Sequence, residues 1–301
     1  MDYFLHFIVN KQSRNSDTTF KKLLLEIPKY THRYEISVTE SIEQLDELLY
    51  QFKEQNNNKV IIVMVGGDGS LNQLVTLFEK YELKNYIGYI PSGSGNDFAR
   101  ANHIPVNTEK AIAHLFNITE KQELSIIHAT EGDTEHFAVN SLGIGLDGLV
   151  NHFVNSGLRK KYLGATSYLT GVISGFLKQK KFKLTLKVDD GVYHFDHVQL
   201  ALIANNPFFG GGINILPPAN GKDDYLDILI ADNVSAWDLF LILPRVLFKQ
   251  THLSHPKLHS FTTKEVALYT ETEQYGQKDG EQFNQEGFAY TVNVRKRAFW
   301  I

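Results

Sequence analysis

The chain of 301 residues contains no cysteine, which excludes disulfide bonds, thiolate metal ligands and cysteine nucleophiles. This composition fits a reducing compartment. The chain also lacks an excess of positive charge, because its formal net charge is −4 and its pI is about 6.3. That balance argues against a dedicated nucleic-acid-binding protein. With 43% apolar and 21% charged residues, the sequence is typical of a globular protein, and its length allows two domains.

Two further motifs are missing. No Gly-x-x-x-x-Gly-Lys-Ser/Thr motif occurs, so the chain is not a P-loop enzyme. Residues 1–10 have neither a basic region before their apolar run nor a small-residue cleavage site, so they predict a first strand rather than a signal peptide.

One apolar segment, residues 162–177, carries no charge and lies between basic flanks at 159–161 and 178–181. It is shorter than the roughly 20 residues of a membrane-spanning helix and contains several glycines. We therefore expect a helix that is packed inside the protein or touches a membrane surface. The basic flanks fit anionic headgroups and an ordinary solvated face equally well.

Residues 1–123 alternate between strand and helix patterns. The expected strands are 3–9, 34–38, 60–65 and 86–90, and the expected helices are 16–27, 41–52 and one that ends near 79. This alternation predicts an α/β domain with a mostly parallel sheet. In such domains ligands bind beyond the C-terminal ends of the strands.

The pattern changes after residue 123. Strands are expected at 182–188, 192–205, 225–231, 265–269 and 288–294, a hairpin turn at 189–191, and a helix near 235–248. We predict that residues 124–290 form a strand-rich, β-sandwich-like domain with helical insertions. The tail, from about 291 to 301, is expected to return to the first domain.

The most informative segment is residues 60–72, in which a β-branched apolar run stops at Gly66-Gly67-Asp68-Gly69 and a helical pattern follows. Glycines let a backbone approach phosphate closely, and a helix N-terminus offers free N–H groups. A carboxylate in such a turn repels phosphate unless a divalent cation lies between them. Asp68 is therefore the first candidate for magnesium-linked chemistry.

A second glycine turn, Ser92-Gly93-Ser94-Gly95-Asn96-Asp97, also follows an expected strand and opens an expected helix. Its small hydroxyl and amide residues suit phosphate or sugar, and Asp97 supplies a second carboxylate. The alternative is a serine-glycine turn in which Asp97 is an ordinary N-cap. Two such turns, each with an aspartate, favour the functional interpretation. Residues 278–281, Lys-Asp-Gly-Glu, by themselves indicate only a hairpin turn.

Together these motifs resemble the diacylglycerol kinase catalytic-domain family, in its soluble bacterial lipid-kinase branch. The resemblance rests on Gly-Gly-Asp-Gly-Ser-Leu-Asn at 66–72, Pro-Ser-Gly-Ser-Gly-Asn-Asp-Phe-Ala at 91–99 and Asp-Gly-Glu at 279–281. Residues 139–147, 210–212 and 217–219 add to it, and the similarity covers essentially the whole chain. The Gly-Gly-Asp-Gly motif alone is shared with NAD kinases and phosphofructokinases.

The resemblance implies that residues 1–123 form the nucleotide-binding domain and residues 124–290 the lipid-substrate domain, and it also implies residue roles. It implies ATP binding by Asn10, Thr39, Gly66, Gly67, Asp68, Gly69, Ser70, Leu71, Asn72 and Ser94. It also implies a network of Asp68, Asp97 and Glu281 with water and Mg²⁺, in which Glu281 accepts the proton and Asp279 lies beside it. A structural Mg²⁺ is implied at Asp223, through its side chain, and at Asn220 and Tyr225, through their backbones.

Some positions depart from the family pattern. Ser70 and Ser94 replace the usual threonine and keep the hydroxyl, and Gln73 replaces a common glutamate. Asp224 stands where glycine is usual, so a backbone that needs a positive φ there is expected to be strained.

We therefore predict an ATP- and Mg²⁺-dependent kinase that phosphorylates a hydroxyl of diacylglycerol or a related lipid. Phosphoryl transfer needs a positioned phosphate and neutralised charge, which the glycine turns and a carboxylate-bound Mg²⁺ would supply. The alternatives are an NAD-kinase-like enzyme for a soluble acceptor and a non-catalytic nucleotide- or lipid-binding module. We expect a cytoplasmic protein in peripheral contact with the inner face of the membrane and no nucleic-acid partner, and the sequence allows a homodimer. Six residues fit either an apolar lipid groove or core packing: Phe208, Phe209, Trp237, Phe240, Leu241 and Leu243.

Overall fold

The computed structural model describes residues 3–55, 59–146, 175–176 and 178–301, which divide into two compact units. Unit 1 comprises Met1–Leu124 and Lys296–Ile301, and unit 2 comprises Ser125–Arg295. The sequence-based division set the corresponding boundaries at 123 and about 291. The chain thus has the expected two-domain architecture.

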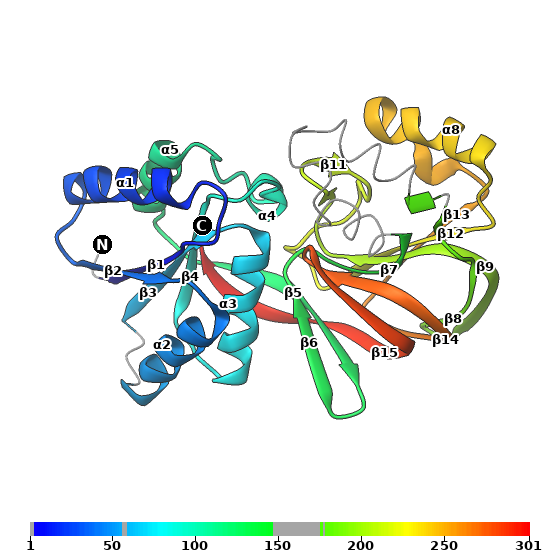
Figure 1. Ribbon diagram of the computed structural model, residues 1–301, viewed down its shortest axis with the longest axis horizontal. Coiled ribbons are helices and arrows are strands. Elements are labelled where there is room, and N and C mark those ends of the chain that lie inside the picture. Colours follow the sequence, from blue (N-terminus) through cyan, green and yellow to red (C-terminus); the bar gives the residue numbers. More distant parts are fainter. Residues whose placement is uncertain (1–2, 56–58, 147–174, 177) are drawn as a thin grey trace. The chain divides into compact units, whose positions relative to one another are not determined.

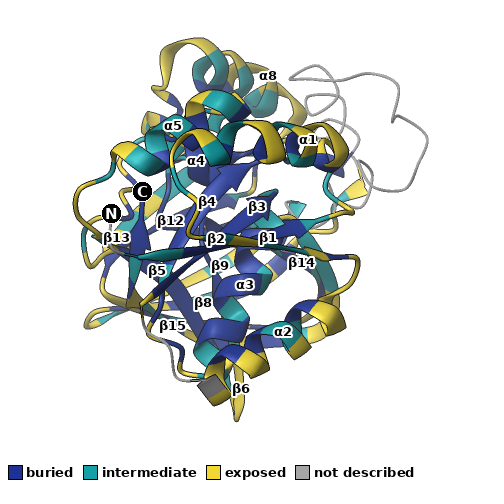
Figure 2. Cartoon of the chain, turned by 90° about the vertical axis from the view of Figure 1, so that its left-hand side faces the viewer, coloured by how far each residue is buried: buried dark blue, intermediate teal, exposed yellow. Residues whose placement is uncertain are grey.

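Unit 1 is built on four strands in the order β2, β1, β3, β4. Their bounds are β1 Phe4–Asn10, β2 Tyr34–Thr39, β3 Val60–Gly66 and β4 Tyr86–Pro91. Each neighbouring pair runs parallel. Every residue of β3 is buried, as expected for a parallel strand covered on both faces, and Figure 2 shows this burial in dark blue.

Helices cover both faces of this sheet (Figure 1). On one face, α1 (Ser16–Glu26) packs against α5 (Thr108–Asn117), and on the other α2 (Ile42–Gln55) packs against α3 (Asp68–Lys80). The short η1 (Ile27–Lys29) follows α1, and α4 (Asp97–Ala101) follows β4. Since β3 leads into α3 and β4 into α4, both glycine turns lie at the carboxyl ends of neighbouring parallel strands.

The chain end completes unit 1. The last residues of β15 (Glu281–Trp300) pair in parallel with β4, joining Phe299 to Ile87 and Trp300 to Gly88. The Trp300 indole N–H donates to the carbonyl of Leu115 (3.3 Å). Trp300 belongs to the apolar core cluster that also contains Leu5 and Val63, so the tail is part of the core of unit 1.

Unit 2 is dominated by antiparallel strands. Its strands are β5 (Gln122–Glu131), β6 (Thr134–Ala138), β7 (Ser141–Gly145), β8 (Phe182–Val188), β9 (Gly191–Ala204), β12 (Leu226–Asp232), β13 (Leu258–Thr263), β14 (Glu265–Lys278) and most of β15. A separate ribbon pairs β10 (Phe208–Phe209) with β11 (Ile213–Asn214). In β8 every second residue is buried, the pattern of a strand with one face on the core.

Several sequence-based expectations for unit 2 were wrong. The strands expected at 265–269 and 288–294 are too short, because β14 and β15 pair all the way to a turn after Lys278. The register shifts between Thr270 and Glu273, and the polar residues around this irregularity break the apolar alternation that marks a strand. Strands β5, β6, β7 and β13 were not predicted.

The helix expected near 235–248 is confirmed as α8 (Ala236–Pro244), which η2 (Arg245–Lys249) and η3 (His252–Ser254) follow. A capping box starts α8: the Ser235 hydroxyl accepts the Asp238 N–H (3.2 Å), and the Asp238 carboxylate accepts the Ser235 N–H (2.8 Å). The segment 162–177 lies outside the described residues except for Gly175 and Phe176. Within the described ranges, none of the helices combines the length and the apolar character needed to cross a bilayer.

Candidate active site

The two glycine turns of unit 1 touch through their backbones. A Cβ added to Gly93 would lie 2.5 Å from the Gly67 Cα, closer than any real contact, and one added to Gly67 would lie 3.3 Å from the Gly93 Cα. The Ser92 N–H also donates to the carbonyl of Gly66 (2.8 Å). Both motifs therefore form one surface of exposed backbone at the edge of the sheet, and any side chain at either glycine would fill it.

Asp68 links the same two turns through its carboxylate. Its Oδ2 accepts the N–H of Asp97 (3.1 Å), and its Oδ1 accepts the N–H of Phe98 (3.0 Å). These are N–H groups of the first turn of α4, so Asp68 caps that helix from a distant position in the sequence. Asp68 and Asp97 are thus neighbours, as the sequence comparison of the two motifs suggested.

The segment after β1 lies against both turns. The Asn10 side-chain amide donates to the Ser70 hydroxyl (2.8 Å), and the Ser13 hydroxyl lies 2.9 Å from the hydroxyl of Ser92. The guanidinium of Arg14 lies 3.5 Å from the Ser94 hydroxyl. Arg14 places a positive charge beside the second glycine turn. The sequence analysis missed it because nothing in its local pattern separates it from a solvated arginine.

A pocket with about 630 Å³ of empty volume opens beside this segment, still within unit 1. It brings together Asn10 and Thr39, which were both expected to contact nucleotide, and adds Gln73 of α3 and Met64 of β3. The α3 residue Leu71 is fully buried, so only its backbone is available to a ligand. Asn72 is 1% exposed, and its Oδ1 has no hydrogen-bond partner in the described part of the chain. A buried acceptor of this kind needs a donor or a cation.

In unit 2, Asp279 and Gly280 form the two-residue turn between β14 and β15. Both have positive φ, 47° and 86°, as the hairpin turn typical of Asp-Gly requires. The Asp279 carboxylate reaches across the sheet to the chain after β6 and accepts the N–H groups of Val139 (2.5 Å), Asn140 (2.8 Å) and Ser141 (3.1 Å). Asp279 is therefore an anchor that positions the first residue of β15, Glu281.

Glu281 is half-buried and pairs with Lys278 across the hairpin. Asp279 and Glu281 belong to unit 2, and Asp68 and Asp97 belong to unit 1. The expected network of these carboxylates therefore stays a prediction, as do their catalytic roles.

The expected structural metal site is a tight loop in unit 2. The Asp223 carboxylate accepts the Tyr225 N–H (3.0 Å), and the Asn220 carbonyl accepts the Asp223 N–H (3.3 Å). Asp224 is absent from the residues with positive φ, so the strain expected at this position is not present. All the candidate metal ligands are oxygen atoms, which suits a hard cation. The Asp223 carboxylate and the Asn220 carbonyl, however, already accept these two hydrogen bonds. Among the described residues no cluster of three acidic or histidine side chains forms a metal centre.

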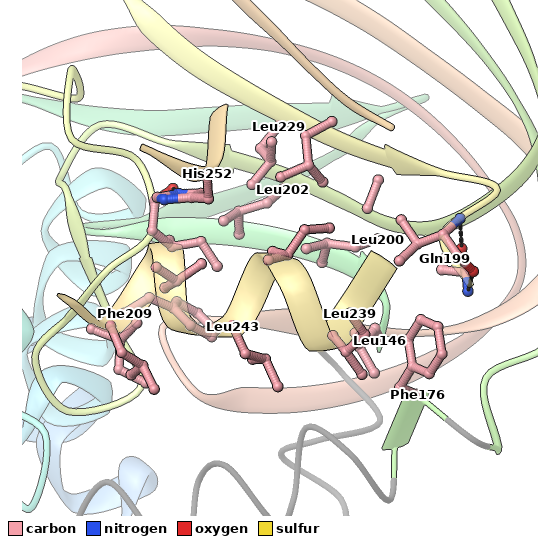
Figure 3. A pocket seen from close by; sticks show the side chains of 18 residues that line it. Leu146, Phe176, Gln199, Leu200, Leu202, Phe209, Leu229, Leu239, Leu243 and His252 are labelled. Atoms are coloured by element: carbon pink, nitrogen blue, oxygen red, sulfur yellow. Dashed lines mark hydrogen bonds between the residues drawn. The ribbon is translucent and has the colours of Figure 1, made fainter. Parts of the chain in front are cut away.

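A large apolar pocket lies in unit 2, between α8 and the sheet. Figure 3 shows Leu239 and Leu243 of α8 opposite Leu200, Leu202 and Leu229 of the strands. Phe209 also lines it, so two of the six residues proposed for a lipid groove, Phe209 and Leu243, are in the pocket. Trp237 and Phe240 do not line it and are 68% and 64% exposed.

Two polar side chains stand among the lining residues of this pocket. Gln199 is satisfied, because it donates to the Val234 carbonyl (3.0 Å) and accepts the Val234 N–H (2.7 Å). His252 is fully buried, and its Nε2 lies 2.7 Å from the Ile215 carbonyl, which makes Nε2–H the donor. Burial lowers the pKa of His252, so the ring is neutral near pH 7. The pocket therefore presents no charge to a ligand.

Comparison with known proteins gives relatives along the whole chain. "Putative lipid kinase YtlR" of Bacillus subtilis (strain 168) is 24% identical over 286 residues, which cover 91% of this chain and 92% of that protein. A "Putative lipid kinase" of Staphylococcus aureus (strain Mu3 / ATCC 700698) is 25% identical over 252 residues, which cover 82% and 79%.

A solved structure described as "A putative diacylglycerol kinase from Bacillus anthracis str. Sterne" has the same fold. Its TM-score is 0.78 at 19% identity, and the match covers 97% of this chain and 94% of that chain.

Two family patterns match the chain in succession. The diacylglycerol kinase catalytic domain matches residues 5–128, and the YegS C-terminal NAD kinase beta sandwich-like domain matches residues 140–296. Together they extend over both structural units and include the motifs at 66–72, 91–99 and 279–281. The chain belongs to the family of kinases in which a diacylglycerol kinase catalytic domain is followed by a YegS C-terminal domain.

Proposed function

We propose that this protein transfers the γ-phosphate of ATP to the hydroxyl of diacylglycerol or a closely related lipid. The observation that carries the acceptor class is the uncharged apolar pocket of unit 2. Its lining is almost entirely apolar, and apolar surfaces of this kind bind hydrocarbon through the hydrophobic effect. A dinucleotide such as NAD brings phosphates and ribose hydroxyls that this lining does not match.

In this proposal unit 1 binds the nucleotide. The turns at Gly67 and Gly93 pack backbone to backbone, and the N-terminus of α3 directs its free N–H groups toward the same edge of the sheet. Asn10, Thr39 and Gln73 line the neighbouring pocket, which suits the base and ribose. Arg14 adds a positive charge beside Ser94.

Magnesium fits the residues of unit 1, since Asp68 and Asp97 supply carboxylates and Asn72 supplies a buried oxygen without a described partner. When bound, Mg²⁺ neutralises phosphate charge and helps to orient the transferred group. Asp68 also fixes the second glycine turn through its two N–H bonds, so its role includes positioning.

The acceptor hydroxyl must lose its proton as its oxygen bonds to the γ-phosphorus and the bond to ADP breaks. We assign Glu281 as the residue that takes this proton. Asp279 holds the turn before it, since its three N–H bonds fix the start of β15. Asp279 is thus a positioning residue for Glu281.

The test is a transfer assay with labelled ATP, Mg²⁺ and a panel of acceptors: diacylglycerol in mixed micelles, phosphatidylglycerol, sphingosine, undecaprenol and NAD. We expect label in diacylglycerol or a related lipid and none in NAD. Label in NAD alone would establish the soluble-acceptor alternative, which the family relation of the C-terminal domain to NAD kinase brings into consideration. Nucleotide binding without transfer to any acceptor would establish a non-catalytic module.

A further inference from the structure

The outward side of α8 and η2 carries large apolar side chains that remain exposed among the residues that the structure describes. Trp237 is 68% exposed, Phe240 64% and Phe248 82%. Together with Leu241 (37%), these residues recur at the spacing of one helical face. The rings of Trp237 and Phe240 stack on each other at 5.6 Å. We call Trp237, Phe240, Leu241 and Phe248 the outer face.

The opposite side of the same segment is also apolar. Leu239, Ile242, Leu243 and Val246 line the pocket of unit 2 (Figure 3). An ordinary surface helix pairs an apolar inner side with a polar outer side, and α8 does not. The outer face is therefore an apolar surface for which the described residues supply no partner, as is typical of an interaction site.

The segment formed by α8 and η2 carries one acidic and two basic side chains. The only acid in α8, Asp238, is turned into the capping box with Ser235 and lies 3.6 Å from His255. Arg245 and Lys249 follow on η2, and neither makes an ion pair with any described acidic residue. A surface of aromatic residues flanked by arginine and lysine matches an anionic bilayer interface, where aromatic rings settle at headgroup depth.

We propose that the outer face, with Arg245 and Lys249, docks this protein onto an anionic lipid bilayer. The segment from Ala236 to Lys249 is too short to span a membrane, so it lies in the plane of the interface. This inference rests on the proposed function in that an acceptor lipid resides in such a bilayer. It places the pocket of unit 2 on the other side of the docked helix from the lipid.

The chain offers a direct probe, because it has two tryptophans and only one is on the outer face. Trp300 is 5% exposed in the core of unit 1. Vesicles of phosphatidylcholine with added phosphatidylglycerol, mixed with the full chain without ATP, are expected to shift the tryptophan emission to shorter wavelength. Lipids brominated on their acyl chains are expected to quench it. In the Trp237→Phe variant, which retains Trp300, both signals should disappear.

Sedimentation with the same vesicles measures the strength of docking. The double variant Phe240→Ser/Phe248→Ser is expected to bind at least about tenfold more weakly, since each ring loses its transfer from water. The control is Leu25→Ser on α1, which removes an apolar side chain that is 69% exposed elsewhere. For charge, Lys249→Glu should weaken binding several-fold, and Lys21→Glu, an exposed lysine of α1, should not.

Three outcomes decide the proposal. Loss of vesicle binding in the outer-face variants, with unchanged transfer to a short-chain diacylglycerol dissolved below its aggregation limit, supports it. Full vesicle binding by these variants overturns it. A change in sedimentation velocity without any change in vesicle binding also overturns it and makes the outer face a contact between copies of this chain. If the wild-type chain docks on vesicles but phosphorylates no lipid, the proposed function fails and the docking surface stands.

Discussion

The two units use an aspartate in the same way but build their turns differently. In unit 1, Asp68 accepts two N–H bonds from the neighbouring glycine turn, and the turns touch because Gly67 and Gly93 have no side chains. In unit 2, Asp279 accepts three N–H bonds from a segment about 140 residues earlier in the chain. The packing of the turns in unit 1 thus depends on the absence of side chains at two glycines. The position of the turn in unit 2 depends on one buried carboxylate.

This difference explains why the motifs of unit 1 were easier to interpret. The local sequence of a glycine turn between a strand and a helix already indicates phosphate binding, because few other structures need those residues in that order. An Asp-Gly pair in a hairpin is common for conformational reasons alone. Its second role appears only when the distant segment is in place.

The largest expected effect is on catalysis and concerns Glu281. The Glu281→Gln variant keeps size and hydrogen-bonding capacity but cannot take a proton, so lipid phosphorylation should fall by roughly 10²- to 10⁴-fold. The thermal unfolding midpoint should stay near that of the wild type. Glu286→Gln, an exposed glutamate on the same strand, is the matched control and should retain activity. A fully active Glu281→Gln enzyme would contradict the assignment of Glu281 as the proton acceptor.

Next in size is the stability effect of the two aspartates. Asp279→Asn should lower the free energy of unfolding by about 3 kcal/mol, because an amide replaces one of two buried oxygens that accept three N–H groups. Asparagine tolerates the positive φ at this position, so the variant changes the hydrogen bonds and not the turn. Asp68→Asn should lower the stability by only about 1–2 kcal/mol, since two bonds are affected.

Urea unfolding of both variants measures this ranking. Asp190→Asn, in the exposed turn between β8 and β9, serves as the control and should change little. A larger loss for Asp68→Asn than for Asp279→Asn would reverse the comparison of the units.

The glycine contact of unit 1 should give a smaller loss of stability together with a loss of nucleotide binding. Gly93→Ala forces a Cβ against the Gly67 Cα, so the two turns must separate, at a cost of about 1–3 kcal/mol. ATP affinity measured by calorimetry should drop with it. Gly132→Ala, where no atom lies within 4 Å but φ is +58°, tests backbone strain alone and should leave ATP affinity unchanged. Normal affinity in Gly93→Ala would show that the contact is not part of the nucleotide site.

The smallest effect is on pH dependence. Burial lowers the pKa of His252 below its ordinary value of 6.5, so the unfolded chain binds a proton that the folded ring does not. The resulting stability is complete above about pH 6.5 and declines as the pH falls below that value. His252→Leu should therefore reduce the drop in the urea midpoint between about pH 7.5 and about pH 5.5.

Part of this pH dependence should remain in His252→Leu, because burial also lowers the pKa of His6 in unit 1 and of His136 in unit 2. An unchanged drop in the variant would mean that His252 takes up no less proton in the folded protein than in the unfolded chain.

The sequence by itself determined most elements of unit 1, although α5 was not predicted. Its strands carry continuous apolar runs and its helices a 3.6-residue period, so each is visible without its neighbours. It also indicated that the two glycine turns work together, since both follow strands of one sheet. The family resemblance rested on the same residues, and the family patterns matched at 5–128 and 140–296 confirm it.

The tertiary structure decided what depends on pairing or on burial from a distance. The polar half of the β14–β15 hairpin is extended because the two strands supply hydrogen bonds to each other. Its own side chains do not favour strand structure. The sequence alone also did not predict that Arg14 lies beside Ser94 or that Asp279 binds residues 139–141. Nor did it predict that Leu243 lines the pocket while Trp237, on the same helix, is exposed. A residue's chemistry is written in the sequence, but its neighbours are set by contacts between segments that the sequence separates.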